Sequence, residues 1–126
     1  MPADYIKSLR KHYIKSVVNA MMFEALQRGE FAFTRCYALL ALSTLHKDNP
    51  KKQTFSYEKI VAQAKVEGYN TRKHTEQGIK HGLNAFQHAG IVIRSDDKKF
   101  YGLHSRFERE VSDIAKDIRA AITGAG

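Results

Sequence analysis

The sequence predicts a mainly helical α+β domain that carries one small β-hairpin. Most segments place apolar residues at intervals of three and four, as amphipathic helices do. Around residue 95, two short strand-like segments flank a polar turn. Glycines follow several of the helical segments, where helices commonly end. With 126 residues, 43% of them hydrophobic, the chain is long enough for one compact core, so we expect a single domain over residues 1–126.

The first helix is expected over residues 4–28. Ile6, Leu9 and Tyr13 keep a helical rhythm, and Gly29 stands where a C-cap belongs. Further apolar residues widen this stripe beyond one face: Ile14, Val18, Met22 and Ala25. So wide a stripe must be covered on two sides, which its own domain and a second chain could share.

The central segment, residues 34–103, contains most of the remaining elements. We expect helices over 34–46, 57–67 and 72–88, a short strand over 53–55, and hairpin strands over 91–94 and 99–103. Ser56 is a suitable N-cap, Gly68 and Gly90 end two helices, and Asn70 or Thr71 caps the helix that starts at residue 72. The turn between the helices expected over 57–67 and 72–88 is therefore short and contains a glycine.

A last helix is expected over residues 105–122. Ser105 and Glu108 have the spacing of a capping box. Its apolar residues recur at three and four: Phe107, Val111, Ile114, Ile118 and Ile122. Such a seam packs along another helix, either the first helix of the same chain or its equivalent in a second copy. We favour the first helix, and together the two terminal helices offer an interface for a homodimer.

The chain is strongly basic, with a formal charge of +8 and a pI near 9.7. Residues 47–103 carry eleven Lys and Arg against six acids, whereas residues 104–126 are balanced at four against four. A basic surplus suits a polyanion, because each cation that neutralises a phosphate releases counterions. An acidic protein or a lipid surface would suit it almost as well.

The helix over 72–88 has the sharpest functional pattern. One arc carries long donors and amides with no carboxylate: Lys73, Gln77, Lys80, His81, Asn84 and Gln87. These groups hydrogen-bond to phosphates and base edges in a DNA groove. Most solvated faces mix Glu with Lys, but Glu76 lies off this arc. The alternative is that the arc is only a solvated face.

The hairpin adds a second group of cations, Arg94, Lys98 and Lys99. Asp96 and Asp97 also lie in its turn, and a turn role alone explains them. Cations on a protruding hairpin can contact a phosphate backbone. Two more cations with the same expected role stand in the connector that precedes the first strand: Lys51 and Lys52.

Other classes of function find little support in the sequence. The single cysteine, Cys36, excludes an intrachain disulfide, and its apolar surroundings predict a buried thiol. His74, His81 and His88 recur every seven residues, about 10.5 Å apart on a helix and too far to share one ion. No catalytic motif appears. We therefore expect that the protein is not an enzyme and that it binds no metal, cofactor or small-molecule substrate. No apolar run is long enough for a membrane helix, and we expect an intracellular protein.

A family resemblance covers a little over half of the chain. Its loose apolar pattern runs through Phe55, Tyr57, Ile60, Ala64, Leu83, Phe86, His88 and the strand over 91–94. This pattern resembles the C-terminal winged helices of origin recognition complex subunits, although the chain has no ATPase region like theirs. Its helix, core, helix layout also resembles small dimeric winged-helix regulators and replication terminators. The resemblance implies a winged helix-turn-helix flanked by terminal helices, with a role in transcription regulation, DNA replication or plasmid maintenance.

We therefore expect a non-enzymatic protein that binds double-stranded DNA. The residues expected to contact DNA are Lys51, Lys52, Asn70, Thr71, Lys73, Gln77, Lys80, His81, Asn84, Arg94, Lys98 and Lys99. The main alternative is a winged-helix module that docks onto another protein within a larger complex. Binding of single strands would need exposed aromatic rings, for which Tyr69 and Tyr101 are the candidates.

Overall fold

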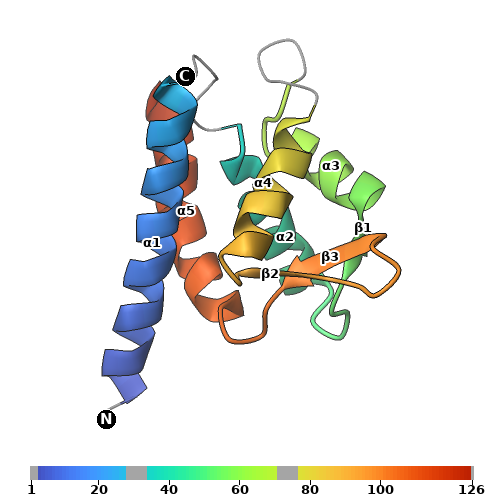
Figure 1. The fold of residues 1–126 in the computed structure, drawn as a ribbon, viewed down its shortest axis with the longest axis horizontal. Helices are drawn as coiled ribbons and strands as arrows, with labels where there is room; N and C mark the ends of the chain where they lie inside the picture. Colours follow the sequence, from blue (N-terminus) through green and yellow to red (C-terminus); the bar gives the residue numbers. More distant parts are fainter. Residues whose placement is uncertain (1–2, 28–33, 71–76, 126) are drawn as a thin grey trace.

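Five helices and a small three-stranded antiparallel sheet form the described part of the protein (Figure 1). This computed structural model describes residues 3–27, 34–70 and 77–125. The elements are α1 (Ala3–Gln27), α2 (Cys36–Asp48), β1 (Phe55–Ser56), α3 (Tyr57–Val66), α4 (Gly78–His88), β2 (Val92–Arg94), β3 (Phe100–Leu103) and α5 (Glu108–Ala125). The predicted class, mainly α with a small hairpin, is confirmed.

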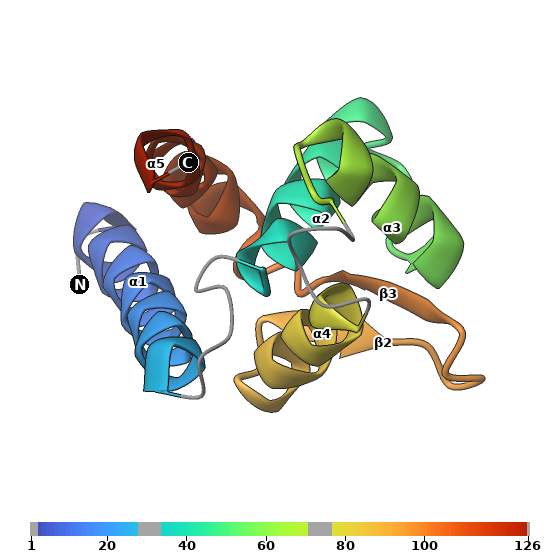
Figure 2. The same ribbon diagram turned by 90° about the horizontal axis from the view of Figure 1, so that it is seen from above.

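Helix α2 is the centre of the core. It packs against α3, α4 and α5, which surround it in the view from above (Figure 2). Its middle is apolar on every side, and Leu39, Leu40 and Leu42 are all buried. A helix can be apolar all round only where neighbours cover every face. Cys36 at its start is buried as predicted, and burial raises the pKa of its thiol to about 12.

The sheet has the order β1-β3-β2, so the last strand of the chain lies in the middle. Phe55 of β1 pairs with Tyr101, and Arg94 of β2 pairs with the same residue from the other side. The predicted hairpin is confirmed within one residue at each strand end. Because β3 is central, Tyr101 has a neighbouring strand on both sides and is buried.

Several predicted element ends are confirmed and others are wrong. The Ser56 hydroxyl accepts a hydrogen bond from the Lys59 N–H, as an N-cap should. Helix α4 begins at Gly78 instead of residue 72, and Gln77 is its N-cap, whose carbonyl accepts the first helical bond from His81. Residues 72–76 of that predicted helix lie outside the described residues.

The predicted capping box of the last helix is wrong. Helix α5 begins at Glu108, three residues after Ser105. The Glu108 carboxylate lies 3.0 Å from Nδ1 of His46 instead of turning back to the start of its own helix. Glu108 therefore pairs with a side chain of α2 instead of with the backbone at the start of its own helix.

Helices α1 and α5 pack side by side and run in the same direction (Figures 1 and 2). Arg10 pairs with Glu110 at 4.0 Å and Lys15 pairs with Asp117 at 3.5 Å. Since both residue numbers increase from one pair to the next, the two helices are parallel. The prediction that the last helix packs on the first is confirmed. None of the helices in the described ranges is long and apolar enough to span a bilayer.

A partly buried ion pair ties α5 to the end of α3. The Arg119 guanidinium donates to both carboxylate oxygens of Glu67, each at 3.0 Å, and to the Thr44 hydroxyl at 3.0 Å. Burial alone would raise the pKa of Glu67, but the hydrogen bonds from Arg119 and Thr44 and the charge of Arg119 lower it overall. Three helices, α2, α3 and α5, are thereby joined at one point.

A buried histidine holds the start of α5 and the end of β3. His46 Nε2 accepts a 2.9 Å hydrogen bond from the Leu103 N–H, so the ring proton lies on Nδ1 and faces Glu108. Burial lowers the pKa of His46 and outweighs the opposing charge of Glu108. The neutral ring is the form that fits, because a protonated Nε2 could not accept from Leu103.

Stability should therefore fall when the solution is acidified. The pKa of His46 in the folded protein is below the ordinary value of 6.5, so its contribution is present above pH 6.5 and is lost as the pH falls through the folded pKa. We expect His46→Gln to be less stable than the unmodified protein at pH 7 and to lose less stability between pH 7 and pH 5. Thermal unfolding at both pH values measures this, with the exposed His81→Gln as the control. An unchanged pH dependence in His46→Gln would contradict the role of His46.

Candidate nucleic-acid interface

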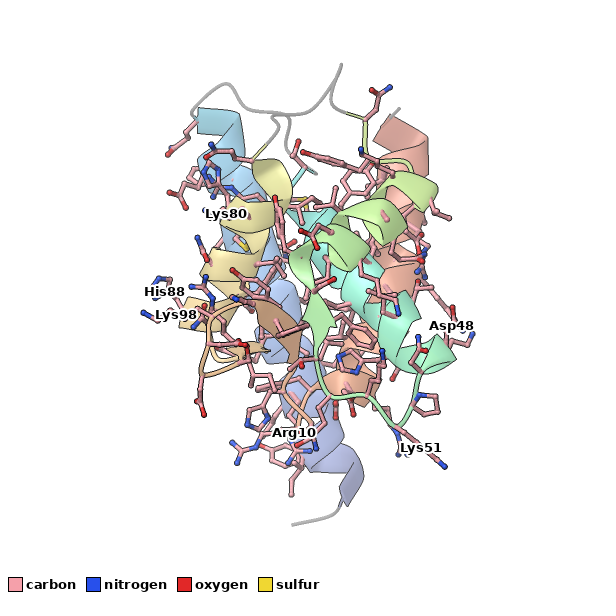
Figure 3. The ribbon with its side chains drawn as sticks, turned by 90° about the vertical axis from the view of Figure 1, so that its right-hand side faces the viewer. Arg10, Asp48, Lys51, Lys80, His88 and Lys98 are labelled. Carbon is pink, nitrogen blue, oxygen red and sulfur yellow. The ribbon has the colours of Figure 1, made fainter. Side chains whose placement is uncertain are left out.

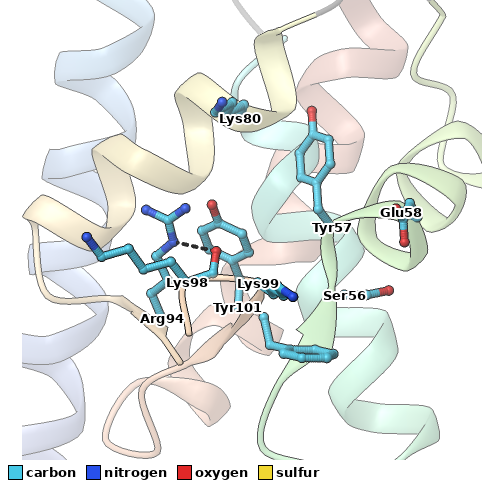
Figure 4. Close-up of a pocket in the computed structure, with 9 residues that line it drawn as sticks. Ser56, Tyr57, Glu58, Lys80, Arg94, Lys98, Lys99 and Tyr101 are labelled. Atoms are coloured by element: carbon cyan, nitrogen blue, oxygen red, sulfur yellow. Dashed lines mark hydrogen bonds between the residues drawn. The ribbon is translucent and has the colours of Figure 1, made fainter. Parts of the chain in front are cut away.

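A surface hollow of about 400 Å³ lies between α4, the start of α3 and the β2–β3 hairpin (Figure 4). We call it the basic hollow. Its described lining residues are Ser56, Tyr57, Glu58, Lys80, Arg94, Lys98, Lys99, Phe100 and Tyr101. Four of these residues are cations and one is an acid. Side chains from three separate elements therefore place a positive charge surplus at one site.

Arg94 is the cation whose position is best defined. Its guanidinium lies 5.0 Å from the centre of the Tyr101 ring, a cation–π distance. Its Nε donates a 3.1 Å hydrogen bond to the Lys98 carbonyl across the hairpin, drawn as a dashed line in Figure 4. The terminal nitrogens then point toward α4, where Lys80 lies (Figure 4). Tyr101 and the turn thus hold a fork of donors in place before any ligand binds.

The hairpin turn is held by its own side chains. The Asp97 carboxylate accepts from the Ser95 hydroxyl and, at 3.1 Å, from the Lys99 N–H. These hydrogen bonds, that of Ser95 first, lower the pKa of Asp97. Lys98 adopts a left-handed backbone with φ of 62°. The predicted turn role of Asp97 is confirmed, and this turn presents Lys98 and Lys99 at the protruding end of the hairpin.

Close packing on α2 fixes the position of α4. Ile79, Leu83 and Phe86 on its inner face are fully buried. A Cβ added to Gly82 would stand 2.4 Å from the carbonyl oxygen of Arg35, so only glycine lets the two backbones approach this closely. With that face buried, Lys80 and His81 are exposed on the outer side of the helix.

Apart from Lys51 and Lys52, the predicted DNA-contacting residues fall into three groups. Lys80, Arg94, Lys98 and Lys99 line the basic hollow, and His81 is exposed beside Lys80 on α4. Gln77 and Asn70 are exposed outside the helices, and Asn84 is half-buried. Thr71 and Lys73 lie outside the described residues.

Lys51 and Lys52 line a different hollow, with Gln53 and His104 among its other walls. Figure 3 places Lys51 on the opposite side of the molecule from Lys80 and Lys98. The structure therefore does not bring the connector lysines together with the cations of α4 and the hairpin. His88, in contrast, lies on the same side as Lys80 and Lys98 (Figure 3).

The two tyrosines expected to be exposed are buried. Tyr69 packs edge-on against Tyr37 at 5.8 Å between ring centres, and Tyr101 lies in the central strand. That expectation was wrong because both rings are covered by segments distant in sequence. Sequence reasoning missed two aromatic residues that also line the basic hollow, Tyr57 and Phe100, together with the polar residues Ser56 and Glu58. The position of Phe100 in β3, one before the buried Tyr101, is the alternation signal that could have found it.

Comparisons of the chain with models of known protein families, with curated proteins and with solved structures found no match.

Proposed function

We propose that this protein binds double-stranded DNA as a winged helix-turn-helix protein, without catalysing a reaction. The observation that supports the proposal most is the shared hollow to which Lys80 of α4 and the three cations of the hairpin contribute. Helix α4 would be the recognition helix and the β2–β3 hairpin the wing. The element order α2, β1, α3, α4, β2, β3 is the one expected of such a domain.

The chemistry of the basic hollow favours a phosphate backbone as its ligand. Arg94 offers a fork of donors that matches phosphate oxygens, and three lysines offer point charges around it. Glu58 is the one carboxylate among the described lining residues, so the site keeps a positive surplus. His81 on α4 and Gln77 at its N-cap are exposed nearby, and both side chains can hydrogen-bond to base edges.

Charge removal at the hollow should weaken DNA binding and its dependence on salt. In a fluorescence-anisotropy titration of a random-sequence duplex, we expect Lys80→Ala combined with Lys99→Ala to reduce affinity. Each lost phosphate contact should flatten the slope of log K against log salt by about 0.9, so two contacts should flatten it by about 1.8. Lys98 is left unchanged because it occupies the left-handed position of the turn that holds the hairpin.

The matched control removes two lysines elsewhere. Lys47 lies in the last turn of α2 and Lys116 lies on the outer side of α5, and both are exposed. Lys47→Ala combined with Lys116→Ala changes the net charge equally and should leave most of the slope intact. Equal losses in the two double variants would contradict binding at the basic hollow and would indicate a general charge effect.

The same titration separates the competing functions. Absence of binding at low salt would contradict the proposal and favour an acidic protein partner. Phe100 is 38% exposed beside the four cations, which is an arrangement suited to stacking an unpaired base. Preference for a single strand of equal length, lost in Phe100→Ala, would therefore assign the hollow to single-stranded nucleic acid instead of a duplex.

A further inference from the structure

Helix α1 has a second apolar stripe that its own chain leaves largely exposed, although one of its residues, Tyr13, also packs against Phe107 at 6.0 Å between ring centres. Ile14, Val18 and Met21 form the buried side of α1. The stripe on the outer side, which we call the outer seam, consists of Ile6, Leu9, Tyr13, Ser16, Ala20 and Phe23. Their spacing alternates three and four, the heptad pattern of a helix that packs along another helix. Leu9 is 50% exposed and Phe23 is 64% exposed.

Nothing polar in the outer seam would lose a hydrogen bond if the seam were covered. The Ser16 hydroxyl donates to the His12 carbonyl at 3.0 Å. The Tyr13 hydroxyl donates to the Ala89 carbonyl at 2.7 Å. Burial of a hydroxyl costs little when its hydrogen bond persists. The seam can therefore be buried without leaving a donor unsatisfied.

We propose that the outer seam is the contact surface for a second copy of this chain, paired antiparallel with the first. If the two α1 helices cross so that residue 9 of one lies beside residue 20 of the other, three layers form. Leu9 then faces Ala20, Tyr13 faces Ser16, and Ile6 faces Phe23, with each layer present twice by symmetry. Large side chains meet small ones in two of the three layers, which lets the helices interdigitate. Parallel pairing would instead place Ala20 on Ala20 and Ser16 on Ser16.

Charge also favours a second copy. A chain of net charge +8 can pair with itself only where its cations stay apart. No residue of the outer seam is charged, and Lys11 and Lys15 project from the other side of α1. Lys15 is moreover paired with Asp117 of α5. An acidic partner would gain nothing from this uncharged face.

The exposed area is large enough for a modest dimer. Tyr5 flanks the seam and is 50% exposed, and the other large apolar residues of this side are 37 to 64% exposed. At roughly 200 Å² for a large apolar side chain, these residues expose about 500 Å² per protomer. A symmetric pair would bury about 1,000 Å², the lower limit for a specific interface. We therefore expect a reversible dimer instead of a permanent one.

Sedimentation velocity over about 1 to 300 µM protein measures this equilibrium. The full chain should approach twice its 14.3 kDa mass as the concentration rises. Ala20→Glu would bury a carboxylate against Leu9 of the second copy, so the dissociation constant should rise at least about tenfold. Asn19→Glu adds the same charge one residue away, outside the seam, and should change it little. A monomer at every concentration, or a dimer that tolerates Ala20→Glu, would overturn the proposal.

Cysteine cross-linking tests the direction of pairing. In the antiparallel register, position 20 of one chain lies about 16 Å along the axis from position 20 of the other, too far for a disulfide. Ala20→Cys alone should therefore not cross-link under mild oxidation, whereas a mixture with Leu9→Cys should. Cys36 is buried with a raised pKa and does not compete. Cross-linking of Ala20→Cys with itself would overturn the antiparallel arrangement.

Discussion

Replacing Gly82 with alanine is expected to lower the free energy of unfolding by about 3 kcal/mol, at the upper end of what overpacking usually costs. The new Cβ would stand 2.4 Å from the Arg35 carbonyl oxygen and 3.2 Å from the Ala38 side chain. Because this oxygen belongs to the backbone at the start of α2, rotation of a side chain cannot relieve the clash. Helix α4 must shift outward, which opens the packing of Ile79 and Leu83.

Urea denaturation of Gly82→Ala measures this loss. Gln87→Ala is the control, because Gln87 is exposed on the same helix and its replacement should change stability by no more than about 0.5 kcal/mol. Equal denaturation midpoints for the two variants would show that α4 and α2 are not in close backbone contact. Alanine is the better helix former, so intrinsic propensity alone predicts the opposite sign for Gly82→Ala.

Arg119→Met is expected to cost about 2 kcal/mol at pH 7. The substitution leaves the Glu67 carboxylate, only 14% exposed, without its charged partner. Breaking a fully buried pair costs about 3–5 kcal/mol, but Arg119 is 40% exposed and water screens the interaction. Lys116→Met on the exposed side of α5 is the control and should have little effect.

The loss in Arg119→Met should depend on pH in a defined direction. The pKa of Glu67 lies below its ordinary value of 4.5, so the pair contributes stability above that pH. This contribution is lost as the pH falls through the folded pKa. The difference in unfolding free energy between Arg119→Met and the unmodified protein should therefore shrink in acid. A difference that stays constant down to pH 3 would contradict the ionic role of Glu67.

Local patterns predicted most of the elements, because their causes lie within a few residues. The Ser56 cap, the turn at Asp97 and the buried stripe of α4 each depend on neighbours within one or two helical turns. The cations of α4 and the hairpin could be named for the same reason. Their convergence on one hollow depends on the sheet order, which brings residue 94 and residue 101 together.

Errors arose where distant segments decide the outcome. Tyr69 is covered by Tyr37 of α2, and Glu108 is drawn to His46 instead of to Ser105. Lys51 and Lys52 carry the expected charge, but the connector places them at a different hollow from Lys80 and Lys98. The periodicity of the sequence does not predict which distant segments come into contact. The sequence identified the cations expected to contact DNA. Only the tertiary fold shows that those within the described residues lie at two separate hollows.

The pairing of α1 with α5 has a consequence for the order in which the chain can fold. Arg10 and Glu110 are one hundred positions apart, and Tyr13 bonds to Ala89 across 76 positions. Contacts of such long range form only after the intervening loop has closed. During synthesis, α1 leaves the ribosome first and α5 last among the described helices. The buried face of α1 must therefore stay uncovered until nearly all of the remaining elements have been made, a period in which it is open to chaperones and to premature contact with other chains.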